Sequence, residues 1–307
     1  LSAMGKASRR KKIDPSKREK FRPLIPFVDR PFEGLTIERD LVAMRELIPC
    51  AVLPAKTNSD NGSSEFDFVT LLPDGAPAMV REDGRILVGL QTRFNSSDLS
   101  HDLAGALTAA IAMEDSGETG VVKFDVRDPA PRLQDVLDRA FIADDKKMKN
   151  AAHPTQVEIR EDFEYWFNPE EDLDEDMLVA LQQNRDDMVP TAAVEGVDGM
   201  FWCQMNNNFV RYVTEIEEDP LFTALARLQA SGTAKLGENS KFVGAFRACG
   251  VAIPVFQVDP EATPADLEAP ALALRDQLAK ALTNDTPLTD DERRARAGLI
   301  SRQVTIR

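Results

Sequence analysis

The spacing of apolar residues divides the first half of the chain into a helix, a group of strands and a second helix. Apolar positions at helical spacing lead up to Ile48, and the proline that follows pushes this residue out of helical space. The segments whose apolar residues run or alternate as in strands are 50–53, 66–72, 78–81 and 86–90. The Asp-Gly dipeptide at 83–84 predicts a hairpin turn between the last two of them. Leucine or isoleucine then recurs every four residues over 99–111, which predicts a helix with Asp98 as its N-cap.

The same order of elements returns in the second half of the chain. A helical stretch at 178–181 leads to Val189, which again precedes a proline. The strand candidates that follow are 191–194, 200–205 and 209–214. A second helix is expected around 221–228 and ends at Ser-Gly, as the helix of the first half does.

A shorter third copy of this opening leads into the C-terminal helices. Residues 242–245 repeat the helical opening, and they lead to Ile253 before a proline and to a strand at 255–258. Helices are expected over 264–282 and from Asp290. Together these patterns predict an α+β fold of two related units, each helix–strand–antiparallel hairpin–helix, plus a C-terminal helical extension. The expected domains are an arm at 1–22, a first unit at 23–150 and a second unit with the C-terminal helices at 151–307. The alternative is that helix, proline and strand follow one another by common usage, without a duplication.

Charge is distributed very unevenly along the chain. The 307 residues carry a net charge of −15, although the charged fraction of 29% and the hydrophobic fraction of 43% are ordinary for a globular protein. Residues 1–22 contain nine Lys or Arg against Asp14 and Glu19, so this arm carries +7 and the remainder −22. Because the arm has almost no apolar residues to bury, we expect it to be disordered. The acidic body argues against a general attraction to nucleic acid or anionic membrane.

The basic arm is the one candidate for contact with nucleic acid. Its candidate nucleic-acid-binding residues are Lys6, Arg9, Arg10, Lys11, Lys12, Lys17 and Arg18. Lysine and arginine bind phosphates, and such binding releases counterions and depends little on base sequence. The alternative is an arm that only improves solubility or folds back on the acidic body.

Signals for catalysis, a cofactor or a metal are weak. The sequence has no Walker loop, no Gly-rich dinucleotide fingerprint and no nucleophile elbow. His101 falls in the first turn of a predicted helix, where we expect it to face solvent. Cys50, Cys203 and Cys249 are far apart and are expected to be reduced, buried apolar residues, which fits a reducing compartment. We therefore predict no cofactor and no catalytic residue.

Two further groups of residues have both a structural and a functional interpretation. The acidic run at 170–176 suits the positive end of a helix, and its spacing does not match a calcium-binding loop. The aromatic groups at 165–167 and 201–202 are expected to pack in the core, although they could line a pocket or a partner surface.

Several longer stretches resemble a known family. The start MGKASRRKK at 4–12 with RPFEGL at 30–35, the stretch KFVGAFRACGVAIPVF, and the end LTDDERRARAGLISRQVTIR at 288–307 are similar to an uncharacterised actinobacterial family of unknown function. The resemblance spans essentially the whole chain and implies a cytoplasmic protein, but no known activity or cofactor. The repeated unit is also faintly similar to the SseB-like fold.

These observations favour a non-enzymatic binding protein. Its basic arm would contact RNA, as on ribosomes, while its acidic body would face other proteins. The alternatives are an enzyme with a site between the two units and an adaptor without a nucleic-acid role. We expect a cytoplasmic location and no membrane partner, because no apolar run approaches the length of a membrane span and no secretory signal is recognised.

Overall fold

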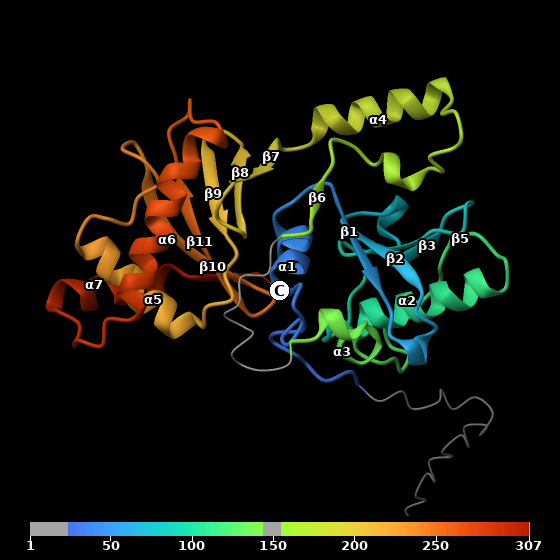
Figure 1. Ribbon diagram of the computed structural model, residues 1–307, viewed down its shortest axis with the longest axis horizontal. Helices are drawn as coiled ribbons and strands as arrows, with labels where there is room; N and C mark the ends of the chain where they lie inside the picture. Colours follow the sequence, from blue (N-terminus) through green and yellow to red (C-terminus); the bar gives the residue numbers. More distant parts are fainter. Residues whose placement is uncertain (1–23, 144–154, 307) are drawn as a thin grey trace, which may run out of the picture.

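The protein folds into two lobes, each built on a six-stranded β-sheet with helices packed against it (Figure 1). The structure is a computed structural model and describes residues 24–143 and 155–306. The α+β class expected from the sequence is confirmed. The basic arm at 1–22 lies outside the described residues.

The first lobe begins with the helix and strands that the apolar spacing predicted. Its elements are α1 (Glu38–Glu46), β1 (Ala51–Lys56), β2 (Glu65–Val69), β3 (Ala78–Val80), β4 (Ile86–Gly89), α2 (Leu99–Asp115), β5 (Gly120–Val121), α3 (Leu133–Val136) and β6 (Glu158–Ile159). The strand order in the sheet is β5-β3-β4-β2-β1-β6. β3 and β4 form the expected hairpin, whereas β2 and β4 run parallel. Asp98 caps α2 as predicted, because its Oδ1 atom accepts a hydrogen bond from the Ser100 amide at 3.0 Å.

The chain then passes through a separate helix into the second lobe. The elements are α4 (Glu175–Asp187), β7 (Thr191–Ala193), β8 (Met200–Gln204), β9 (Asn208–Tyr212), α5 (Glu218–Ala230), β10 (Lys241–Ala248), β11 (Val251–Gln257), α6 (Glu268–Leu282), α7 (Asp290–Arg302) and β12 (Val304–Ile306). The strand order is β12-β10-β11-β9-β8-β7. Helices α5, α6 and α7 pack together on this sheet. The C-terminal helical extension is therefore present, and β12 pairs in parallel with β10 at the sheet edge.

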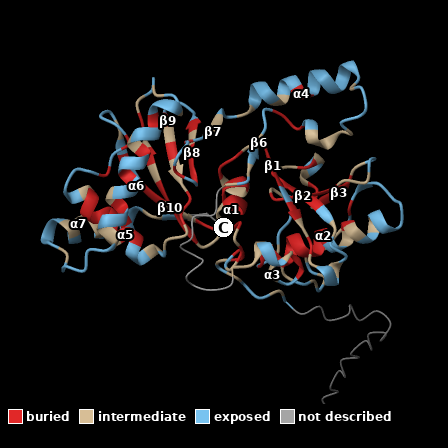
Figure 2. Ribbon diagram, in the orientation of Figure 1, coloured by how far each residue is buried: buried red, intermediate tan, exposed pale blue. Residues whose placement is uncertain are grey.

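Helix α1 lies between the lobes and holds them together (Figures 1 and 2). Leu41 and Met44 of this helix are fully buried in a core that includes both the inner face of the first sheet and Phe201 and Ile253 of the second sheet. Burial of one such side chain stabilises a fold by roughly 1.5–3 kcal/mol. The apolar face of α1 therefore fixes one lobe against the other.

The predicted third copy of the helical opening is wrong. Residues 242–245 belong to β10, which forms an antiparallel hairpin with β11. The turn consists of Cys249 and Gly250, whose φ angles of 48° and 74° are both positive, as a two-residue hairpin turn requires. A short apolar run is compatible with either a helix or a strand. Here the turn and the pairing with β11 produce a strand.

The internal duplication stays a prediction. A helix, strands with a hairpin, and a second helix occur in both halves, but four strands lie between α1 and α2 and three between α4 and α5. The parallel pair β2–β4 has no counterpart between α4 and α5. The division of the chain into two units at 150 and 151 also stays a prediction. Strand β6 pairs with β1, so the first sheet includes residues beyond 150.

Candidate functional site

A cleft of about 610 Å³ opens on the outer face of the first sheet, the face that does not carry α2. Its floor includes Val52 and Asp67 of neighbouring strands and Ile159 of β6. Its wall is the segment that follows β6 and leads to α4, and Arg185 of α4 closes one side. The cleft thus lies where the link between the lobes crosses the sheet.

An aromatic cluster fixes this wall to the sheet. The rings of Phe163 and Trp166 are stacked, with 4.6 Å between their centroids. The Tyr165 hydroxyl and the Trp166 indole N–H both donate to the carbonyl oxygen of Leu71, at 2.7 and 2.8 Å. Burial raises the pKa of the Tyr165 hydroxyl, so it remains a neutral donor. The 165–167 group therefore packs against the core, as expected, while Tyr165 and Phe167 also line the cleft, which is the alternative that the sequence left open.

Two ion pairs set the shape of the cleft. Asp67 on the floor accepts two hydrogen bonds from Arg85, Nε to Oδ2 at 2.7 Å and Nη2 to Oδ1 at 2.5 Å. Asp162 is buried and accepts from Nε of Arg185 at 2.6 Å and from the Glu164 amide at 2.8 Å. Paired arginine–carboxylate contacts of this kind are rigid and directional. These carboxylates are consequently occupied in holding α4 and the strands in place.

The remaining charges make the cleft acidic. The segment 155–190 contains twelve carboxylates against Arg160 and Arg185, a net charge of −10. The exposed carboxylates that line the cleft are Glu158, which pairs with Arg160 at 2.9 Å, and Glu161, Glu164 and Glu171; Arg81 and Arg185 line it as well, so carboxylates are in excess. A concave surface with an excess of charge of one sign concentrates the field and attracts ligands of the opposite sign. The arrangement suits cationic side chains.

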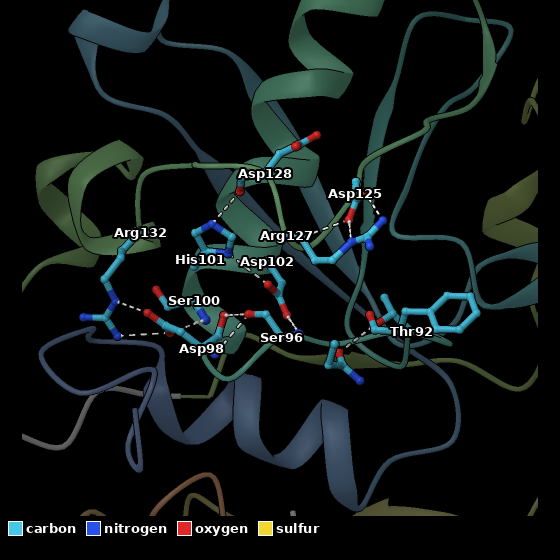
Figure 3. A network of polar contacts seen from close by, with 12 residues as sticks. Thr92, Ser96, Asp98, Ser100, His101, Asp102, Asp125, Arg127, Asp128 and Arg132 are labelled. Carbon is cyan, nitrogen blue, oxygen red and sulfur yellow. Dashed lines mark hydrogen bonds and ion pairs between the residues drawn. The ribbon is translucent and has the colours of Figure 1, made fainter. Parts of the chain in front are cut away.

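A second polar cluster surrounds the start of α2 (Figure 3). His101 is buried, so the prediction that it faces solvent is wrong. Its Nδ1 atom lies 3.0 Å from Oδ1 of Asp102, and its Nε2 atom lies 2.9 Å from the carbonyl oxygen of Asp128. The loop that carries Asp128 covers the first turn of α2, which the helical spacing alone does not reveal. Both ring nitrogens are thus engaged in joining this loop to α2.

The other members of the cluster join α2 to α3. Arg132 binds the Asp98 carboxylate, with Nε to Oδ2 at 2.7 Å. The Ser100 hydroxyl donates to the side chain of Gln134 at 2.7 Å and accepts from the Leu133 amide at 2.9 Å. These contacts fully engage the serine and the histidine, so the cluster acts as a clamp between segments rather than as a nucleophile and base.

A smaller cavity of about 380 Å³ lies at the junction of the lobes. Its walls include Arg45 and Glu46 at the end of α1, and Arg247 and Cys249 of the β10–β11 hairpin. Burial raises the pKa of the Cys249 thiol to about 12, which keeps it in the weakly nucleophilic thiol form. Arg247 binds Glu218, with Nε to Oε2 at 2.8 Å. Groups of both charges are therefore already paired in this cavity.

The fates of the remaining predicted residues differ. The arm residues Lys6, Arg9, Arg10, Lys11, Lys12, Lys17 and Arg18 lie outside the described residues. All three cysteines are free; Cys50 and Cys203 are buried as expected and Cys249 is half-buried. The acidic run is a helix start, in which Asp174 caps α4 by accepting from the Met177 amide at 2.8 Å. Within 24–143 and 155–306, no group of three or more His, Cys, Asp or Glu side chains is placed to hold a metal ion. In the same residues, no helix is long and apolar enough to cross a membrane.

Residues 31–307 match a family of proteins described as a family of unknown function (DUF5926). The chain belongs to this family. The match contains both sheets, the cleft and the polar cluster, and it confirms the resemblance to an uncharacterised family. No curated protein and no solved structure matches the chain, so the likeness of its repeated unit to the SseB-like fold stays a prediction.

Sequence reasoning missed one feature of this DUF5926 member. The sequence predicted a helical stretch at 178–181, and the structure shows that Met177, Leu178 and Val179 in the first half of α4 are exposed. The available signal was the dense acidic sequence on both sides of these three apolar residues. A helix flanked in this way has few neighbours able to bury it.

Proposed function

We propose that the protein is a non-enzymatic binding protein whose basic arm at 1–22 contacts RNA, as on ribosomes, while its acidic body binds other proteins. The separation of charge carries this proposal: +7 on the arm, −22 on the remainder, and −10 on 155–190 alone. A body of this charge repels phosphate groups, so contact with RNA falls to the arm. The acidic cleft in turn suits basic protein segments.

We favour a binding function over catalysis because the reactive side chains are already engaged in structural contacts. His101 and Ser100 hold α2 against its neighbours, and Asp162 holds α4. In the junction cavity, where an enzyme acting between the units would have its site, burial keeps Cys249 as a thiol. The proposal also includes a cytoplasmic location, which the three free thiols support because reducing conditions keep cysteines unpaired.

A titration with labelled single-stranded RNA tests the role of the arm. The full chain is expected to bind at low salt, and a chain without residues 1–22 is expected to lose this binding. If all seven candidate residues contact phosphates, log K should fall with log salt with a slope of about −5. The double substitution Arg9→Gln and Arg10→Gln should reduce the magnitude of this slope by about 1.4.

A chain with the arm sequence shuffled at constant composition is the control. It should bind RNA as well as the natural arm does, because phosphate contacts carry little sequence information. Equal binding by the full and shortened chains, or binding by neither, contradicts the RNA role and favours an adaptor that contacts proteins alone.

A further inference from the structure

Helix α4 stands apart from both lobes and is almost entirely exposed (Figures 1 and 2). Of its 13 residues only Leu181 is buried. The exposed fractions of Met177, Leu178 and Val179 are 38%, 53% and 61%. Leu178 and Val179, the two most exposed of the three, occupy adjoining sectors of the solvent side of the helix, and exposed apolar surface of this kind marks interaction sites.

The stability of α4 depends on very few contacts. Isolated helices of this length are marginal in water, and most helical stability in proteins comes from packing of an apolar face. Here the observed support is the Asp174 cap, acidic residues in the first turn, the ion pair of Arg185 with Asp162, and the contact of Leu181 with Phe163 and its neighbours. A partner that covered the apolar surface of α4 would therefore stabilise the helix further.

The charges at the C-terminal end of α4 indicate that the partner is positively charged. This end of a helix is negative, and cations are favoured there. α4 instead has Asp186 and Asp187 in its last turn, both exposed, while its basic residue Arg185 is bound to Asp162. Bound cationic side chains would relieve this unfavourable arrangement.

The apolar residues of α4 lie next to the acidic cleft, because Leu178 and Arg185 are seven residues apart and so lie on the same side of the helix. Arg185 of α4 and Leu173, just before the helix, both line the cleft, as do the exposed carboxylates of Glu164 and Glu171. A ligand that follows α4 would therefore meet apolar side chains on the helix and carboxylates beside it. A second copy of the chain is disfavoured as the occupant, since each copy carries −10 on this segment.

We propose that α4 and the neighbouring cleft form a docking surface for a basic amphipathic helix of a partner protein. Apolar residues of the partner pack on Leu178 and Val179, and its Lys or Arg side chains face Asp186, Asp187 and the cleft carboxylates. This rests on the proposed function only in its protein-binding half, and the arm takes no part in it. Helix-in-groove recognition of this kind uses apolar anchors together with flanking charge.

A designed 18-residue peptide of leucine and lysine in helical amphipathic order serves as the probe. Fluorescence anisotropy with the full chain should give saturable binding, and a scrambled peptide of identical composition should bind at least 10-fold more weakly. Hydrogen exchange should slow at the amides of 175–187 when the amphipathic peptide is added.

Two variants separate the apolar and charged contributions. Leu178→Ser with Val179→Ser, and separately Asp186→Asn with Asp187→Asn, should each weaken binding of the peptide about 10-fold. Met205→Ser is the matched control, because Met205 is an exposed apolar residue, 56% accessible, in the turn after β8. It should leave the affinity unchanged, and all variants should keep the RNA binding of the parent chain.

Several outcomes overturn the docking proposal. Equal binding of the amphipathic and scrambled peptides, or no effect of the serine variant, would show that the peptide binds through non-specific charge attraction alone. Self-association that the serine variant abolishes assigns the surface to a second copy. Much tighter peptide binding after removal of 1–22 assigns it to the chain's own arm. Equal RNA binding by the full and shortened chains, or RNA binding by neither, with peptide binding intact, contradicts only the RNA half of the proposed function.

Discussion

Two buried carboxylates of this protein have very different surroundings. Asp162 accepts hydrogen bonds from Arg185 and from the Glu164 amide. Asp40, near the contact of α1 with the second lobe, accepts from the Gln156 amide at 3.4 Å and lies 3.9 Å from Arg39. Within the described residues, its Oδ1 atom is buried without a hydrogen-bond partner. Burial raises the pKa of Asp40 to about 6.

The substitution Asp40→Asn should therefore remove a pH dependence of stability. A carboxyl group whose folded pKa exceeds its unfolded value stabilises the fold fully below the unfolded pKa, near 3.8, and this contribution is lost as pH rises through about 6. Between pH 4 and pH 7.5, the free energy of unfolding of the variant should rise relative to that of the wild type by at most about 3 kcal/mol. Urea unfolding at both pH values measures this, with exposed Asp285→Asn as the control. If the free energies of unfolding of the two proteins differed by the same amount at both pH values, the charge on Asp40 would not destabilise the fold.

Helix α2 illustrates how packing overrides helix propensity. Gly105 lies in the interior of this helix, where glycine costs roughly 1 kcal/mol relative to alanine. A Cβ atom at this position would lie 2.2 Å from Cζ of Phe124. The ring of Phe124 packs directly on the helix, and the absence of a side chain allows this approach.

Substituting alanine at two helical glycines should have opposite effects. Gly105→Ala should destabilise the protein by about 1–3 kcal/mol, because the Phe124 ring must move away from α2. Gly298→Ala in α7 should stabilise it by roughly 0.5–1 kcal/mol, since the nearest atom to the new Cβ is Arg302 Nη2 at 3.7 Å. Thermal unfolding of both variants measures the contrast. A higher melting temperature for Gly105→Ala would show that the ring yields without cost.

Elements with local signals were predictable from sequence, and contacts between distant residues were not. The N-cap at Asp98 and the spacing of α2 both depend on neighbours within a few residues. The β10–β11 hairpin was missed, because its turn uses Cys249 at a positive φ angle and not a familiar Asn-Gly pair. Residues 121–126 alternate between polar and apolar as a strand does, but the strand that forms there is Gly120–Val121.

The candidate site was less predictable for the same reason. The wall of the cleft depends on Tyr165 binding Leu71, residues 94 positions apart, and on Asp162 binding Arg185 across 23 positions. Burial of His101 likewise depends on the loop that carries Asp128. Sequence spacing identified the acidic segment and its aromatic residues, but only the fold brings them to the outer face of the first sheet.

On the scale of the whole molecule, the two proposed functions assign ligands of opposite charge to separate parts of the chain. The two lobes share one core around α1, so the acidic segment at 155–190 is attached to a rigid body. The arm carries positive charge at the N-terminal end of the sequence. Two independent binding functions should follow, and each should be removable without the other.

Titrating labelled RNA and the labelled amphipathic peptide against three chains tests this claim most directly. The three are the full chain, the chain without residues 1–22, and the Leu178→Ser/Val179→Ser variant. The account predicts that arm removal abolishes RNA binding and leaves the affinity for the peptide unchanged. It also predicts that the α4 variant loses about 10-fold in peptide affinity and binds RNA as the full chain does. Loss of both ligands in either altered chain, or of neither, would contradict it.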